Sequence, residues 1–211
     1  MKALIDWLDV RLGVREFYGN SIGYKLPGDS LNLWWLFGGL ATGCIMIQFV
    51  TGFYMLFYYV PVPELAHESI KAMCATAPLG ALARNVHRWS CTLGVAFVFI
   101  HMINVMAKRA YRAPRELNWW TGLMLACIYT LLLITGIIMP WDWRSYWELI
   151  IWVDWIVLIP GVGRFLKDPI LANFTLGRNF AVHIMALPVA IVLVWRLHII
   201  LARRLGLSSG V

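Results

Sequence analysis

The sequence predicts an all-α membrane protein whose core is a bundle of four transmembrane helices. Of its 211 residues, 61% are hydrophobic and 14% are charged, and the mean hydropathy is +0.71. Soluble globular domains are far more polar than this. Four mainly apolar runs are each long enough to cross a bilayer as a helix, which takes about 20 residues. Four of the five histidines lie within these runs, in two evenly spaced pairs.

The four spans are predicted from the distribution of charge along the chain. Residues 31–63 and 117–140 contain no charged side chain, the run 86–107 contains only Arg88, and the run 179–201 contains only Arg196. Such runs are typical of transmembrane helices. The predicted spans cover residues 31–59, 86–107, 118–139 and 179–201, and they belong to one domain, residues 31–211.

Two further segments are expected to lie outside the spans. Residues 1–30 are predicted to form an amphipathic segment on the cytoplasmic side, and residues 1–10 lack the apolar core of a cleavable signal peptide. The apolar stretch 149–159 is too short to span and ends at Pro160 and Gly161. We expect it to form a short helical hairpin on the outer surface, between the third and fourth spans.

The basic residues predict the orientation. With four spans, both termini and the loop after the second span share one side, and residues 1–30, 108–116 and 202–211 hold ten Lys and Arg. Residues 60–85 and 140–178, on the other side, hold six. The positive-inside bias places both termini on the cytoplasmic side of a bacterial inner membrane, or its thylakoid-type equivalent. The net charge of +7 therefore reflects topology, and no nucleic-acid partner is implied.

The two histidine pairs have nearly the same spacing. His87 and His101 are fourteen positions apart, and His183 and His198 are fifteen apart. At about 1.5 Å per residue these separations are about 21 and 22 Å along a helix, and the helical rotation returns the second histidine to within about 60° of the first. The second and fourth spans run in the same direction. His87 is therefore level with His183 near the outer face, and His101 with His198 near the inner face.

Two level pairs of imidazoles are a suitable axial ligand set for two haem irons. Ionisable side chains inside a membrane are costly and mark function by default, and cofactors are bound between facing helices of a bundle. The sequence therefore predicts two stacked haems and an electron path across the membrane. The alternative is that the histidines only hydrogen-bond to neighbouring helices, which is harder to reconcile with two matched pairs. The fifth histidine, His67, is expected in a loop.

Glycines and arginines complete the predicted haem sites. Gly38 and Gly52 in the first span, and Gly122 and Gly136 in the third, are each fourteen apart. We expect these glycines to let the backbone approach the haem edge, although small residues also serve ordinary helix packing. The predicted propionate partners are Arg84, Arg88 and Arg178 near the outer histidines and Arg115 near the inner ones. For Arg115, anchoring at the membrane interface is an equal alternative.

Several motifs resemble the cytochrome b family. They are NVHRWS at 85–90, PRELNWWTG at 114–122, TGIIMPWD at 135–142 and TLGRNFAVHIMALP at 175–188. The similarity runs almost end to end and is closest to the split, b6-type form. The fifteen-residue spacing of His183 and His198 is also that of the split form.

The resemblance implies that the four histidines ligate two b haems in the cytochrome b subunit of a Rieske/cytochrome b complex of the bc or b6f kind. Quinol would be oxidised near the outer face, and one electron would pass to a Rieske iron–sulfur protein and a c-type cytochrome. The other would cross through both haems to quinone at the inner face. A three-helix C-terminal-type subunit usually supplies a Pro-Glu-Trp-Tyr motif, which is absent here. This chain alone should therefore not oxidise quinol, and the complex is expected to be dimeric.

The resemblance also suggests finer sites, with departures. Asp142, Tyr146 and Trp147 fit the family's outer quinone loop, but Trp143 replaces a usual glutamine and Glu148 a small residue. Arg203 is a candidate to stabilise a quinone anion at the inner face, or else anchors the helix to anionic headgroups. Cys44 is a candidate attachment site for a covalently bound haem c, or else a buried free cysteine.

Two other functions follow from the same sequence. The altered loop at Trp143 and Glu148 gives some weight to a di-haem membrane anchor that exchanges electrons between quinone and a dehydrogenase or multihaem module without a Rieske partner. A haem-free channel or transporter has little support, because no transporter-type repeats occur. The four cysteines form no CxxC motif, so neither a zinc site nor a disulfide framework is expected.

Overall fold

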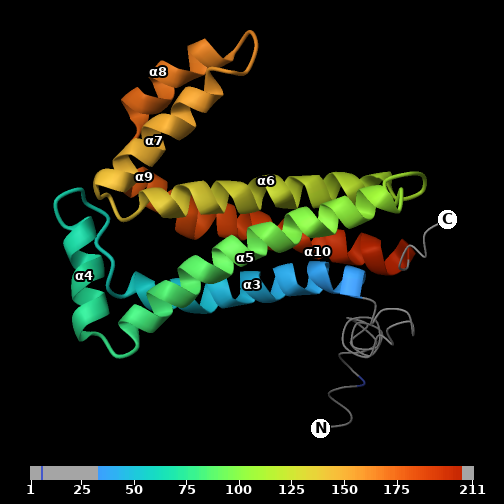
Figure 1. Ribbon diagram of the computed structural model, residues 1–211, viewed down its shortest axis with the longest axis horizontal. Helices are drawn as coiled ribbons and strands as arrows, with labels where there is room; N and C mark the ends of the chain where they lie inside the picture. The colour runs from blue at the N-terminus through green and yellow to red at the C-terminus, as the bar shows by residue number, and fades with distance from the viewer. Residues whose placement is uncertain (1–5, 7–32, 206–211) are drawn as a thin grey trace. The chain divides into compact units, whose positions relative to one another are not determined.

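A computed structural model describes Asp6 and residues 33–205, with side chains described from residue 36 to residue 202. The segment 1–30, predicted to be amphipathic, thus lies outside the described residues except for Asp6. Within the described residues every regular element is a helix. The long helices are α3 (Leu33–Leu56), α5 (Gly80–Ala107), α6 (Glu116–Ile138) and a composite fourth helix, which together form the bundle (Figure 1).

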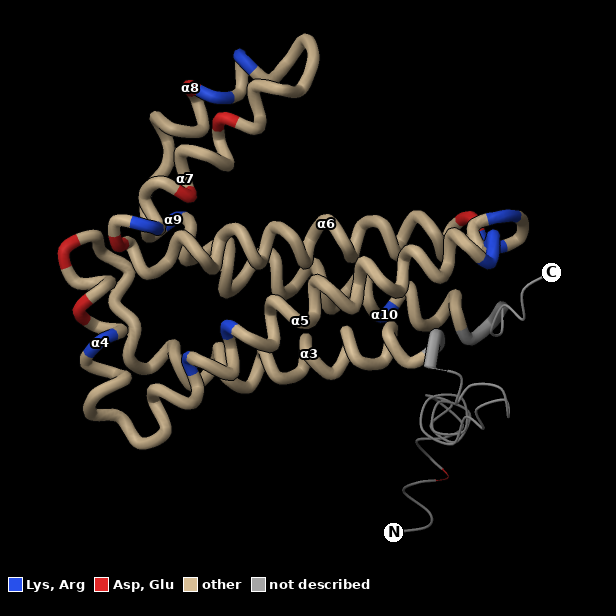
Figure 2. Tube along the Cα trace, viewed as in Figure 1, with Lys and Arg blue, Asp and Glu red and all other residues tan. Residues whose placement is uncertain are grey.

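The membrane character of the bundle is confirmed by its four long apolar helices. The segments that are long and apolar enough to cross a bilayer are Leu36–Leu56, Gly80–Ala107, Glu116–Ile138 and Leu176–Ala202. Large apolar side chains such as Val50, Phe53 and Ile103 are exposed on their outer surfaces, where lipid would cover them. Most Lys, Arg, Asp and Glu residues lie at the ends of these helices or in the connections between them (Figure 2).

The fourth span is a continuous rod made of three segments. It consists of α9 (Leu176–Ala181), the π-helix η2 (Val182–Ala186) and α10 (Leu187–Leu205). The N–H of Leu187 donates to the carbonyl of Val182, which makes this turn one residue wider than an α-helical turn. His183 lies inside the widened turn.

The helices of the bundle pack in pairs. Helix α3 packs closely against α5, and α6 packs against α10 and η2. Polar bonds join the spans: Trp195 Nε1 donates to Thr42 Oγ1 at 3.1 Å, and Asn179 Nδ2 donates to the carbonyl of Thr135 at 2.9 Å. Each packed pair therefore joins a span that carries the predicted glycines to a span that carries the predicted histidines.

A helical hairpin separates the third and fourth spans, as the sequence predicts. It consists of α7 (Trp143–Ile156) and α8 (Gly163–Asn173), which pack together (Figure 1). Helix α7 begins earlier than the apolar stretch indicated because Asp142 caps it, accepting hydrogen bonds from the N–H and the hydroxyl of Ser145, both at 2.8 Å. Gly161, at φ 81°, makes the left-handed turn between the two helices.

His67 lies on a helix, and the prediction that it is a loop residue is wrong. Helix α4 (Ala66–Thr76) begins just after Pro61 and Pro63, so these prolines precede the helix and do not disrupt it. Glu68 lies in the first turn, where the helix dipole favours an acidic side chain. The buried residues Ala66 and Met73 hold α4 to the rest of the structure.

Candidate functional site

The four intramembrane histidines come from two helical rods of the bundle. Helix α5 carries His87 and His101, while η2 carries His183 and α10 carries His198. All four side chains are partly buried. His183 lies near enough to His87, and His198 near enough to His101, for the charged forms of each pair to repel each other. The structure thus brings together the same two pairs that the sequence predicted to be level in the membrane.

Each predicted glycine lies against one of these histidines. A Cβ atom on any of the four glycines would come within 3.0 to 3.2 Å of the Cε1 atom of an imidazole, closer than side chains normally pack. The glycines were predicted to clear space for a haem edge, and the space they clear here contains the imidazole itself. The matched pairs are Gly52 with His87, Gly38 with His101, Gly136 with His183 and Gly122 with His198.

Three threonines orient three of the four imidazoles. Nδ1 of His87 lies 2.8 Å from Thr51 Oγ1, that of His183 lies 2.8 Å from Thr135 Oγ1, and that of His198 lies 2.9 Å from Thr121 Oγ1. Each threonine immediately precedes the glycine that contacts the same histidine. These threonines were not predicted from the sequence, although the Thr-Gly dipeptides were a visible signal.

The threonine hydroxyls determine which ring nitrogen carries the proton. Each hydroxyl donates to a backbone carbonyl of its own helix: Thr51 to Ile47 at 2.6 Å, Thr135 to Leu131 at 2.7 Å and Thr121 to Asn118 at 2.9 Å. A hydroxyl has one proton, so its oxygen accepts the bond from Nδ1–H of the imidazole. Nε2 then keeps its lone pair, which is the form that binds a metal.

His101 is the exception. Phe37, and not a threonine, precedes its matched glycine, and Phe37 packs against Phe97 with ring centroids 5.9 Å apart. Nδ1 of His101 is buried and has no hydrogen-bond partner among the described residues. The ring also lies differently, because its Nδ1 is 3.2 Å from the Cβ position of Gly38, whereas the corresponding distance at the other three glycines is 3.7 Å.

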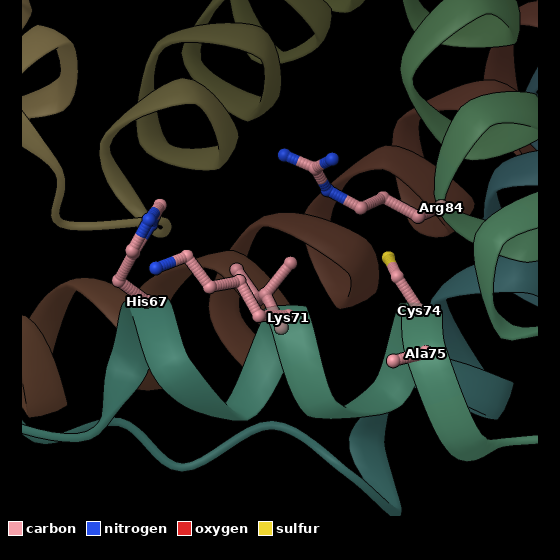
Figure 3. A pocket seen from close by; sticks show the side chains of 6 residues that line it. His67, Lys71, Cys74, Ala75 and Arg84 are labelled. Atoms are coloured by element: carbon pink, nitrogen blue, oxygen red, sulfur yellow. The ribbon is translucent and has the colours of Figure 1, made fainter.

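A cationic cavity lies at the end of the bundle near His87. Its volume is about 330 Å³, and Lys71 and His67 of α4 and Arg84 of α5 extend into it (Figure 3). Lys71 also forms an ion pair with Glu68 at 2.9 Å. Arg84, predicted to bind a haem propionate, therefore faces a space that is large enough and basic enough for a carboxylate.

The other predicted arginines are placed differently. Arg178 Nη1 donates to the carbonyl of Asn173 at 2.7 Å, and Arg88 is exposed on α5 one residue after His87. Arg115 is the N-cap residue of α6, in the connection at the opposite end of α5. The backbone of Arg203 belongs to α10, but its side chain lies outside the described residues.

The predicted outer quinone residues form an aromatic cluster at the start of α7. Trp147 makes edge contacts with Trp143 and with Tyr146, at centroid distances of 5.5 and 5.6 Å. The side chain of Trp143 is 79% exposed. Arg144 and Glu148 form an ion pair on the same helix, with 3.5 Å between Nε of Arg144 and Oε1 of Glu148.

Asp142, also predicted at the quinone site, caps the N-terminus of α7. Partial burial raises the pKa of the Asp142 carboxyl group, but the hydrogen bonds from Ser145 outweigh this effect and hold the pKa below its usual value. The carboxylate therefore stays charged and bonded to Ser145 at neutral pH.

The two histidine pairs, His87 with His183 and His101 with His198, form two tiers along the bundle. Cys44 lies inside the bundle, at a level between these tiers. It is 8% exposed, and its Cβ is 3.0 Å from the position that a Cβ of Gly94 would occupy. The hydroxyl oxygen of Tyr129 would clash with a Cβ at that position, is buried, and has no hydrogen-bond partner in the described part of the chain. The described residues contain no cluster of three or more His, Cys, Asp and Glu that could hold a metal ion.

Comparisons with known proteins show the family to which the chain belongs. The family model described as cytochrome b/b6/petB matches residues 22–206. Cytochrome b6 of Heliomicrobium gestii is 32% identical over 211 residues, which cover 97% of this chain and 99% of that protein. Cytochrome b6 of Synechococcus sp. (strain JA-3-3Ab) is 34% identical over 214 residues, which cover 99% of each.

A solved structure described as a hyperthermophilic respiratory Complex III has the same fold. The two superpose with a TM-score of 0.81 at 28% identity, over 96% of this chain. The matched region is 55% of that chain, so this protein spans about half of its length. Together with the family match, these similarities establish that the chain belongs to the cytochrome b family and is similar over its whole length to the b6 type.

Proposed function

We propose that this chain is the cytochrome b subunit of a quinol-oxidising complex of the bc or b6f kind, and that it carries electrons across the membrane through two b haems. The observation that carries the proposal is the two tiers of paired histidines, each histidine with its own glycine. The relatives named cytochrome b6 and the Complex III structure support it.

The residues present fit two haems, each of which would be held by two histidines. His87 and His183 would hold the outer haem, and His101 and His198 the inner one. Nδ1–H of three of these rings is bonded to a threonine, so that Nε2 faces away with a free lone pair. A bound haem supplies one-electron chemistry at its iron. The protein contributes ligand orientation, a dry interior and a fixed distance between the tiers.

The ends of the bundle would hold the haem propionates. Arg84 and the cationic cavity around it serve the outer haem, with Arg88 and Arg178 as further partners. Arg115 would serve the inner haem from the connection before α6. Arginine suits this task because its guanidinium forms paired hydrogen bonds with a carboxylate.

We extend the proposal to topology and partners. Both termini face the cytoplasm, because residues 108–116 and the terminal segments hold most of the basic residues outside the spans. The partners are a three-helix C-terminal-type cytochrome b subunit, a Rieske iron–sulfur protein, a c-type cytochrome and quinone, in a dimeric complex. The exposed aromatic cluster of Trp143, Tyr146 and Trp147 is the proposed outer quinone-side surface.

A covalent haem c at Cys44 is not part of the proposal. Cys44 is packed against the α5 backbone at Gly94, with the Tyr129 ring beside it, and a thioether-bound haem would have to displace both. Haem staining of the chain after denaturing electrophoresis is therefore expected to be negative.

The test of the proposed function is haem analysis of the purified complex. We expect a pyridine haemochrome assay to give two b haems per chain, and electron paramagnetic resonance to show low-spin iron with two imidazole ligands. A chain without haem, or with one high-spin haem, would contradict the proposal.

The di-haem anchor without a Rieske partner remains the second candidate, because Trp143 and Glu148 alter the outer loop. Copurification separates the two. A Rieske protein and a three-helix subunit in the purified complex support the first function, and a dehydrogenase or multihaem subunit in their place supports the second.

A further inference from the structure

The hydrogen bonds to the four histidines divide unequally between the two tiers. In the outer tier, His87 and His183 each bond through Nδ1 to a threonine hydroxyl, from Thr51 and Thr135. In the inner tier, only His198 does so, through Thr121. Nδ1 of His101 is buried without an acceptor in the described part of the chain, because Phe37 stands at the corresponding position of α3.

Such a bond changes the chemistry of a metal-bound imidazole. An acceptor at Nδ1–H increases the basicity of the ring and makes Nε2 a stronger donor to the metal. A stronger donor stabilises ferric iron more than ferrous iron, so the reduction potential of the haem falls. Hydrogen bonding around the ligands is one of the means by which a protein sets this potential.

We propose that the residue preceding each histidine-contacting glycine sets the relative potentials of the two haems. Thr51 and Thr135 lower the potential of the outer haem, and Phe37 leaves that of the inner haem higher. The proposal rests on the axial ligands assigned under the proposed function. The threonines are positioning residues, because they act through the histidines.

The effect of the residue before the glycine can be tested in both directions on α3, by removing the hydroxyl at position 51 and adding one at position 37. Thr51-Gly52 and Phe37-Gly38 occupy the same helix, fourteen residues apart, and each glycine contacts one histidine of α5. A threonine at position 37 would therefore precede the glycine that contacts His101, as Thr51 precedes the glycine that contacts His87. Valine has the shape of threonine without the hydroxyl, so the bond can be removed with little change in packing.

The experiment is a redox titration of both haems in the purified complex, followed by their optical bands and their electron paramagnetic resonance signals. Thr51→Val is expected to make reduction of the outer haem about tenfold more favourable, which is about 59 mV for one electron, with the inner haem unchanged. Thr51→Ser, which keeps the hydroxyl, is expected to leave the potential of the outer haem at its wild-type value. Phe37→Thr is expected to lower the potential of the inner haem alone.

Two controls separate the hydrogen bond from packing. Thr130→Val removes a hydroxyl of α6 that, among the described residues, donates to the carbonyl of Ala126 in its own helix, and it should move neither potential. Phe37→Val removes the contact with Phe97 without supplying an acceptor. It should not reproduce the lowering caused by Phe37→Thr.

Unchanged outer potential in Thr51→Val, or equal shifts in Phe37→Thr and Phe37→Val, would overturn the inference. If Thr51→Val loses its haem, the comparison of Phe37→Thr with Phe37→Val still tests the inference, because Phe37→Thr adds an acceptor instead of removing one. These outcomes presuppose two bis-histidine haems in the wild-type complex. Their absence would overturn the proposed function, whereas their presence with no shift would overturn this inference alone.

Discussion

A Cβ atom on Gly136 would lie 3.0 Å from Cε1 of His183, so this glycine and this imidazole occupy adjoining space with no room between them. Any larger residue at position 136 must displace the ring. A displaced imidazole loses the geometry that a ligand to iron requires.

Gly136→Val is therefore expected to remove most of the outer haem while leaving the inner one. The matched control is Gly43→Val on α3, because no described atom lies within 4 Å of the Cβ position at Gly43. Haem content per chain, with the optical band of each haem resolved at low temperature, measures the effect. Equal haem content in the two variants would show that the glycine is not required.

Replacing the histidines tests the two tiers directly. His87→Leu and His183→Leu should each remove the outer haem, and His101→Leu and His198→Leu the inner one, because each iron loses one of its two protein ligands. Low-temperature redox spectra distinguish the two haems. Thr130→Val is the control, since the Thr130 hydroxyl donates to the carbonyl of Ala126 within α6, and it should retain both haems. Loss of the same haem from the His87 and His101 variants would contradict the pairing.

Gly94 permits the close approach of α6 to α5 between the tiers. The hydroxyl of Tyr129 lies where a Cβ of Gly94 would be, so Gly94→Ala forces the buried ring to move. Overpacking of this kind costs about 1 to 3 kcal/mol, and the variant should lose haem at a lower temperature than the wild type. Adding Tyr129→Phe, which removes the clashing oxygen, should recover part of the loss. No recovery would mean that the ring and not the hydroxyl limits the packing.

Much of this arrangement follows from the sequence because it depends on charge and on helical geometry. The four spans are predicted by the nearly uncharged runs. The pairing of His87 with His183 is predicted by the position of each histidine along its span, because the second and fourth spans run in the same direction. The helix at His67 was missed because two prolines just before it obscured its start. The threonines were missed because their role depends on which helices pack together, and the pairing of α3 with α5 is a tertiary feature that no local pattern specifies.

Replacement of Arg203 tests the inner quinone site that the family resemblance suggests. Arg203 lies five residues after His198, near the end of α10, and a positive charge that reached a quinone bound beside the inner haem would stabilise the quinone anion. Arg203→Leu is expected to slow reoxidation of the inner haem by quinone, with both haems still bound. Stopped-flow reoxidation measures this, and Arg204→Leu is the matched control for a general loss of positive charge. Equal slowing in both variants would make the two arginines a membrane anchor.

The π-helical turn at Val182–Ala186 explains why the two histidine pairs match although their spacings differ. Fourteen residues of α-helix rotate by about 1400°, which is about 40° short of four turns, whereas fifteen residues rotate about 60° beyond them. A single widened turn takes up one extra residue. His183 and His198, fifteen apart, are thereby brought to the register of His87 and His101, fourteen apart.

Deleting Met185 should therefore convert η2 to α-helix and keep both haems. Met185 is exposed, so the deletion removes no buried contact. The matched control deletes Leu93, which is also exposed and lies between His87 and His101. Leu93 belongs to α5, which is α-helical throughout. That deletion has no widened turn to close, so it rotates His101 by about 100° relative to His87 and should cost one haem. Haem content of the two deletion variants measures the difference. Loss of a haem from the Met185 deletion would show that the π-turn does more than adjust the register, and that it positions His183 itself.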